Sequence, residues 1–185
     1  PSFKSSSSDE AVRDDLRATV EPWLDRLHGL VVGPGLGRRE GVLAGAAEII
    51  KLAARDRRMP VVVDADGLFL VSQRPELVSG CPNVVLTPNK VEFDRIRERV
   101  LKPDDKDPPP DAIREAKELV DGCRALGGVT IIRKGRRDLV SDGTVVLACV
   151  EPGCPRRFGR GRIFFDEAVD VTPRHRARGS KLAAR

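Results

Sequence analysis

Short apolar runs recur along the chain, separated by segments in which apolar residues follow helical spacing. The runs are continuous and do not alternate between apolar and polar positions, as is typical of strands buried on both faces. The pattern predicts an α/β domain with a mostly parallel sheet, helices on both faces, and a late antiparallel hairpin that turns at Asp142-Gly143. Strands are expected near 29–33, 59–67, 83–89 and 129–135, and helices over 39–55, 68–80, 90–101 and 112–126.

The same pattern divides the chain into three parts. Residues 1–10 are polar and rich in serine, and we expect them to be disordered. A helix expected over 11–27, broken or kinked by Pro22, opens an α/β domain that extends to residue 155. The helical and strand periodicity stops in 156–185, a stretch rich in Arg and Gly. This last part is predicted to be a basic and largely irregular tail.

The net charge of +5 belongs to the tail alone. Residues 156–185 contain nine basic and three acidic side chains, whereas the other 155 residues contain 24 and 25. Six Phe, one Trp and no Tyr leave few rings on which nucleic-acid bases could stack, so no nucleic-acid partner is expected. No run approaches the roughly 18 apolar residues of a membrane-spanning helix, so no membrane partner is expected either.

Cysteine usage and the lack of a secretory signal indicate a reducing compartment. The four cysteines and two histidines show no zinc-ligand spacing. The expected location is therefore the cytoplasm. Because the chain starts at Pro1, a mitochondrial or plastid form is expected instead if a targeting peptide stood upstream.

Glycines and acidic residues follow the first two predicted strands, at the edge where open α/β sheets bind ligands. The segment GPGLGR (33–38) either offers backbone N–H groups to an anion or is only a tight strand-to-helix turn. Asp64 and Asp66, after the second strand, are candidate Mg²⁺ ligands. Asp66 alternatively caps the next helix.

Polar residues also follow the third and fourth predicted strands. Asn89 and Glu92 have the spacing of a capping box, and Glu92 is also a third candidate metal ligand. In the segment RKGRRD, Lys134, Arg136 and Arg137 place cationic donors around a glycine, as a polyphosphate site requires. A solvated turn has the same composition, so both interpretations stay open for this segment alone.

Taken together and in this order, four segments resemble one family. VVGPGLGR, VVVDADGLFLV, VVLTPNKVEFDRI and VTIIRKGRRDLVSDG are similar to the ADP/ATP-dependent NAD(P)H-hydrate dehydratases of the ribokinase-like superfamily, from about Pro22 to Arg157. HGLVVGPGLGR points to the eukaryotic, ATP-dependent branch. The resemblance implies a ribokinase-like fold truncated at both ends. It also implies a lyase that repairs hydrated NADH or NADPH with ATP (or ADP) and Mg²⁺, by phosphorylating the nicotinamide-ring hydroxyl and then eliminating phosphate.

The resemblance further implies which residues bind each ligand. Positions that match the hydrate-binding residues of the family are Gly35, Asn89, Lys90, Val91, Glu92, Phe93, Asp94 and Arg95. Positions that match its nucleotide-binding residues are Lys134, Gly135, Arg136, Arg137, Asp138, Gly153, Arg156, Arg157 and Gly159. The implied partners are hydrated NADH or NADPH and an adenine nucleotide, and the resemblance is compatible with a homo-oligomer.

The tail departs from the family after Arg157. There the family continues with a glycine-rich anion hole that ends in the aspartate acting as catalytic base, but this chain reads Arg162-Ile163 where Gly-Asp is expected. No catalytic residue is recognisable, so we expect ligand binding with little or no turnover. The family's later helices, which cover one face of the sheet, and its first strand and helix are missing as well. Such a loss of pattern is typical of a shifted reading frame, a splice variant or a mispredicted exon.

Two other functions fit parts of the sequence. A small-molecule (vitamin-type) kinase of the same superfamily would use the same strand ends, but it would need the same anion hole and base. A degenerate, non-catalytic nucleotide-binding module would use the basic tail to contact an acidic partner.

Overall fold

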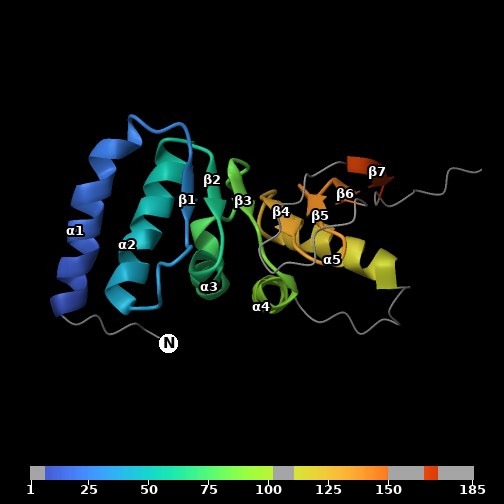
Figure 1. The fold of residues 1–185 in the computed structure, drawn as a ribbon, viewed down its shortest axis with the longest axis horizontal. Coiled ribbons are helices and arrows are strands. Elements are labelled where there is room, and N and C mark those ends of the chain that lie inside the picture. The colour runs from blue at the N-terminus through green and yellow to red at the C-terminus, as the bar shows by residue number, and fades with distance from the viewer. Residues whose placement is uncertain (1–6, 102–110, 150–164, 171–185) are drawn as a thin grey trace, which may run out of the picture.

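The structure is a computed structural model of the chain, and it describes residues 7–101, 111–149 and 165–170. Its strands form one seven-stranded sheet in sequence order, from β1 at one edge to β7 at the other (Figure 1). None of the described helices is long and apolar enough to cross a membrane.

The first four strands pair in parallel, as the continuous apolar runs predicted. They are β1 (Leu30–Val32), β2 (Val61–Val63), β3 (Val84–Leu86) and β4 (Thr130–Arg133). The helices between them also lie where the sequence predicted them. They are α2 (Glu40–Lys51, continued by a π turn over Leu52–Asp56), α3 (Asp66–Gln73, followed by a 3-10 turn over Pro75–Leu77), α4 (Lys90–Val100) and α5 (Asp111–Ala125).

The two faces of the parallel sheet differ in burial. Val63, Leu86 and Ile131 form one row across β2, β3 and β4, and all three are fully buried. On the opposite face, Val31 is 64% exposed and Val62 is half-buried. Here the structure differs from the expected helices on both faces. When parallel strands follow one another in unreversed order, right-handed crossovers place every connecting helix on the same face.

The expected antiparallel hairpin is present. β5 (Leu139–Ser141) pairs antiparallel with β4 and with β6 (Val145–Cys149), and the Asp142-Gly143 turn lies between β5 and β6. β7 (Phe165–Asp170) pairs antiparallel with β6. This strand belongs to the tail that the sequence predicted to be largely irregular, and the rest of 156–185 lies outside the described residues.

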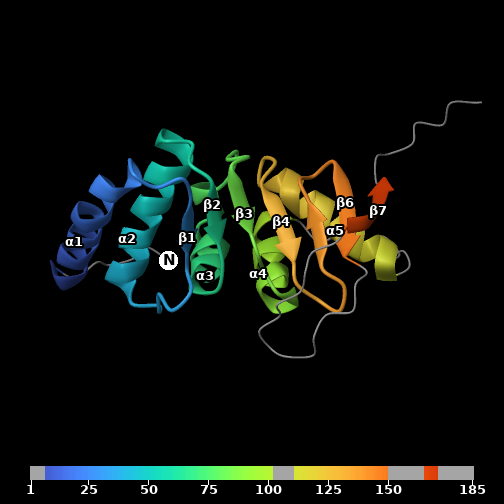
Figure 2. The same cartoon turned by 45° about the horizontal axis from the view of Figure 1, so that its top comes forward.

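The N-terminal helix starts earlier than the serine-rich composition indicated. α1 (Ser7–Leu24) begins inside the segment that was expected to be disordered, and it contains Pro22 in its last turn. It packs along α2 at the β1 end of the sheet (Figure 2). The Asp9 carboxylate accepts a hydrogen bond of 3.1 Å from the N–H of Gly41, in the first turn of α2. This contact stabilises the start of both helices, and residues 1–6 are not among those described.

Candidate functional site

The carboxyl ends of β1 to β4 meet at one edge of the sheet, and Lys134 directly follows β4 at this edge. The backbone N–H of Lys134 donates to the carbonyl of Pro88 at 2.8 Å, and Lys134 forms an isolated parallel bridge with Asn89. The Lys134 ammonium extends across β3 to the carboxylate of Asp64 after β2, also at 2.8 Å. Residues 64, 89 and 134 are therefore neighbours, although up to 70 positions separate them in the chain.

The ion pair with Lys134 sets the charge state of Asp64. Burial alone would raise the pKa of Asp64, but the hydrogen bond and the charge of Lys134, with a hydrogen bond from the N–H of Ala65, outweigh burial and hold that pKa below its usual value. Asp64 is therefore a carboxylate that already has a cation. As a candidate Mg²⁺ ligand it would have to leave Lys134.

Asp66 fixes the glycine-rich loop that follows β1. Its carboxylate accepts from the N–H of Gly37 at 3.0 Å and from Nε of Arg38 at 3.1 Å. The Arg38 guanidinium also lies over the ring of Phe69, 4.3 Å from the centroid. The N-cap position of α3 is Ala65 and has no side-chain cap, so the alternative role of Asp66 as an N-cap is wrong. Asp66 acts across the site, on a loop 29 positions away.

A small pocket of about 130 Å³ lies between the loop after β1, α3 and the start of α4. Its lining includes Arg38 from the loop, Asp66 and Phe69 from α3, and Glu92 and Arg95 from α4. Glu92 and Arg95 are among the positions that the resemblance assigned to the hydrate, whereas Gly35, in the same loop as Arg38, is not part of the lining. Gly35 lies in the loop with φ +71, and a Cβ added to it would have no atom within 4 Å, so its backbone is accessible from outside.

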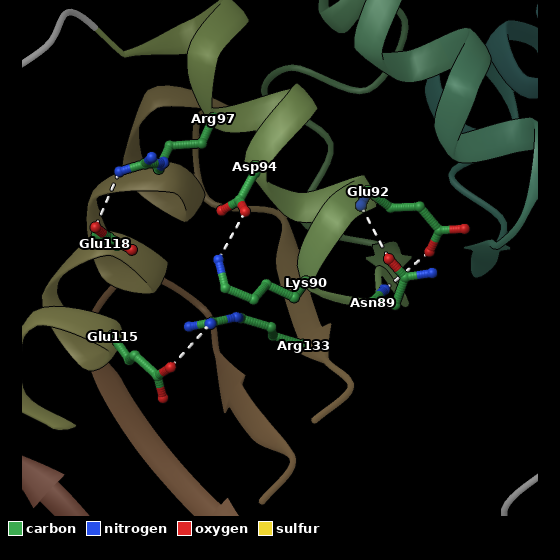
Figure 3. A network of polar contacts seen from close by, with 8 residues as sticks. All are labelled: Asn89, Lys90, Glu92, Asp94, Arg97, Glu115, Glu118 and Arg133. Carbon is green, nitrogen blue, oxygen red and sulfur yellow. Dashed lines mark hydrogen bonds and ion pairs between the residues drawn. The ribbon is translucent and has the colours of Figure 1, made fainter. Parts of the chain in front are cut away.

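The predicted capping box at the start of α4 is confirmed. The Asn89 side chain accepts from the N–H of Glu92 at 3.0 Å, and the Glu92 carboxylate accepts from the N–H of Asn89 at 2.8 Å (Figure 3). Lys90 pairs with Asp94 one turn on, at 2.8 Å. The Phe93 side chain is fully buried in the core, so any ligand contact at this position would have to come from the backbone.

Beyond Lys134, the chain forms a tight loop held by Asp138. The Asp138 carboxylate accepts from the N–H of Gly135 at 2.9 Å. Arg136 and Arg137 between them are exposed. Two guanidinium groups thus project from a loop whose backbone is fixed. Such an arrangement suits a polyphosphate, because binding would have to order only the two side chains and not the backbone that carries them.

This loop borders a groove of about 1340 Å³ between α5 and strands β4 to β6. The described lining contains seven basic and only two acidic side chains: Lys90, Lys117, Arg124, Arg133, Lys134, Arg136 and Arg137, against Glu115 and Asp121. Apolar residues such as Val120, Val146 and Ala148 also line it. An apolar groove bordered by cations suits a ligand with a flat apolar part and several negative charges.

The described residues do not fit a metal ion held by the protein alone. No group of three His, Cys, Asp or Glu side chains is positioned among them to share a cation. The three candidates Asp64, Asp66 and Glu92 each have a partner already: Lys134, the loop after β1, and the backbone of Asn89. Gly153, Arg156, Arg157 and Gly159 lie outside the described residues, so their assignment stays a prediction.

Comparison with known proteins identifies the family. A sequence model of the NAD(P)H-hydrate dehydratase family matches residues 3–161. The chain belongs to this family. The ATP-dependent (S)-NAD(P)H-hydrate dehydratase of Bos taurus is 47% identical over 152 residues, which are 82% of this chain and 43% of that protein. The proteins of the same name from Homo sapiens and Schizosaccharomyces pombe are 46% and 45% identical, each over 76% of this chain and 39% of the relative.

The chain thus spans less than half the length of these relatives. Among solved structures, a hypothetical protein from Streptococcus mutans shares the fold, with a TM-score of 0.51, 14% identity, and coverage of 74% of this chain and 44% of that one. A ribokinase-like superfamily protein from Enterococcus faecalis aligns with a TM-score of 0.46, at 21% identity, over 66% of this chain and 39% of that one. The relatives favour the dehydratase family over the small-molecule kinases.

Two residues at the site were not predicted from the sequence. Arg38 ends the glycine-rich segment after β1, and its contacts with Asp66 and Phe69 depend on the folded loop. Arg133 is the first residue of the cationic segment RKGRRD and the last residue of β4, yet it is buried, with 6% of its surface exposed. The period-2 alternation of β4 was the available signal, because it points Arg133 to the same side as the buried Ile131.

Proposed function

We propose that this chain supplies the ligand-binding part of an ATP-dependent NAD(P)H-hydrate dehydratase, with the nucleotide in the groove beside α5 and the hydrated cofactor at the pocket between the loop after β1 and α4. One observation carries the proposal. The bridge between Asn89 and Lys134 joins the segment assigned to the hydrate to the segment assigned to the nucleotide. A phosphoryl group bound at Lys134 would therefore lie next to a hydroxyl bound near Asn89.

The charges at this junction suit phosphoryl transfer. Phosphoryl transfer is accelerated mainly by positioning and by stabilising negative charge on the transferred group. Lys134 would contact a terminal phosphate, and Arg136 and Arg137 would contact the neighbouring ones. The Asp64 carboxylate holds the Lys134 ammonium over the strand ends before the nucleotide binds. Mg²⁺ would enter bound to the phosphates, since the described residues form no metal site of their own.

The catalytic base is not assigned to any described residue. The base that removes a proton from the hydroxyl must lie within hydrogen-bond reach of it. At the junction itself, Asp64 is held by Lys134 and Glu92 by the backbone N–H of Asn89. We therefore propose that the chain binds both ligands and turns over slowly or not at all. The cytoplasmic location and a homo-oligomeric state likewise remain proposals.

Replacement of Lys134 tests the nucleotide site. We expect Lys134→Met to weaken ADP binding about tenfold in calorimetric titration, since a charge-assisted contact to phosphate contributes roughly 1.5 kcal/mol or more. Lys51→Met removes the same charge at the end of α2, outside the groove, and should leave ADP affinity within about twofold. Equal affinities for the two variants would contradict the nucleotide site.

Activity is measured separately, as ATP-dependent recovery of NADPH absorbance from the hydrate. The expected result is little or no recovery with the 185-residue chain. Rapid turnover would show that a catalytic base is present and would contradict the proposed lack of one. The assignment of the binding sites would be unaffected.

A further inference from the structure

Arg133 is a buried arginine whose hydrogen-bonding capacity is only partly used. Its side chain is 7% exposed, and it lines the groove beside α5. Nη2 donates to the Glu115 carboxylate at 3.1 Å (Figure 3). Nη1 is buried and has no acceptor among the described residues. An unsatisfied buried donor of this kind costs free energy, and a charged one costs more.

The arginine is also held in place. Its guanidinium lies over the Phe93 ring, 5.4 Å from the centroid, and Phe93 is itself fully buried. β4 fixes the backbone, and it directs Arg133 toward the helices while Lys134 points across the strand ends to Asp64. The guanidinium is therefore positioned before any ligand arrives, so little side-chain entropy would be lost on binding.

The partner of Arg133 is a weak competitor for it. Glu115 lies on α5 with a side chain that is 45% exposed, so its carboxylate keeps much of its hydration. Water can replace Arg133 on this carboxylate, whereas the buried guanidinium needs another acceptor in place of Glu115. A phosphate brings several acceptor oxygens and more negative charge, and it could satisfy both Nη atoms at once.

We propose that Arg133 forms a phosphate subsite at the base of the groove, in which a phosphate of the nucleotide replaces the Glu115 carboxylate. The subsite would lie one residue before Lys134 and on the other side of the strand. A nucleotide could therefore be bound through two phosphates, by Lys134 and its loop at one and by Arg133 at the other. The inference extends the proposed nucleotide site, but it does not require that the chain be catalytically active.

Glu115 and Glu118 provide a matched test of this competition. Both lie on α5 and each pairs with an arginine, Glu115 with Arg133 and Glu118 with Arg97 at 2.9 Å (Figure 3). Only Glu115 lines the groove. We expect Glu115→Gln to tighten ADP binding about three- to tenfold, because the competing carboxylate is gone. Glu118→Gln makes the same charge change and should alter affinity less than about twofold.

The complementary variant removes the subsite itself. Arg133→Gln should weaken ADP binding about tenfold, because it removes a charge-assisted contact to phosphate. Arg99→Gln, at the end of α4 and outside the groove lining, is the control for the loss of one positive charge. If Arg133→Gln fails to fold by circular dichroism, the comparison of Glu115→Gln with Glu118→Gln decides alone, since both glutamates are partly exposed.

Inorganic pyrophosphate and NADPH, titrated beside ADP, separate the outcomes. Dependence on Arg133 and Glu115 in the ADP or pyrophosphate titrations supports the subsite, even if the chain shows no dehydratase activity. If only the affinity for NADPH depends on Arg133 and Glu115, the phosphate subsite is supported but binds the diphosphate of the hydrated cofactor and not that of the nucleotide. Equal behaviour of each variant and its control with all three ligands, or no binding of any of them, would overturn the inference.

Discussion

The two ends of the ligand edge differ in how their charges are matched. At the β1–β2 end, Asp66 is satisfied inside the protein by the N–H of Gly37 and by Arg38. At the β4 end, the groove has seven basic side chains against two acidic ones among the described residues. The first region is a rigid frame that already meets its own hydrogen-bonding needs. The second is a cationic surface that an anionic ligand would complete.

The largest difference between the two regions is expected when a glycine is replaced by alanine in each of them and the losses of stability are compared. Gly33 has φ +126, and a Cβ there would lie 1.8 Å from the carbonyl oxygen of Asp64. Gly33→Ala should therefore lower the free energy of unfolding by more than about 4 kcal/mol, or prevent folding. At Gly135 a Cβ would lie 3.1 Å from the carbonyl oxygen of Arg137, and Gly135→Ala should cost about 1 kcal/mol or less. Urea unfolding measures both, and similar losses would mean that the two loops are equally constrained.

A smaller effect is expected when the acidic residue of the frame is removed. Asp66→Ala deletes the acceptor for two donors in the loop after β1, which should cost about 1–3 kcal/mol of stability. The loop would lose its fixed position, so NADPH affinity should fall about three- to tenfold. ADP affinity should stay within about twofold. A fall of ADP affinity equal to that of NADPH would show that the two ends of the edge are not separate sites.

The smallest effect concerns the ion pair that links the two regions. The pKa of Asp64 is below its ordinary value in the folded chain, so the unfolded chain binds the proton first as pH falls. The stabilisation is complete above the unfolded pKa of about 4 and is lost as pH falls through the lower, folded value. Unfolding curves across this acidic range should show a shallower pH dependence for Asp64→Asn than for the unchanged chain. Identical slopes would mean that Lys134 does not stabilise the Asp64 carboxylate.

Local pattern was enough to place most elements of the fold. Continuous valine-rich runs predicted the parallel strands, and the Asn89 and Glu92 spacing predicted the capping box. Both depend on residues within a few positions of one another. The disorder expected for the first ten residues is wrong for residues 7–10, because the contact that orders them is not local. Asp9 is held by the N–H of Gly41, a partner 32 positions away that composition cannot reveal.

The candidate site divides in the same way. The sequence by itself determined which segments follow the strands, and therefore that glycines, carboxylates and cations gather at one edge. Only the tertiary structure decided how they pair: Asp66 with the loop after β1, Lys134 with Asp64, and Arg133 with Glu115. Strand order and register set these distances, and neither is encoded near the residues concerned. Charge pairing at this site is thus a property of the folded sheet, whereas the residues available for pairing were already fixed by the chain.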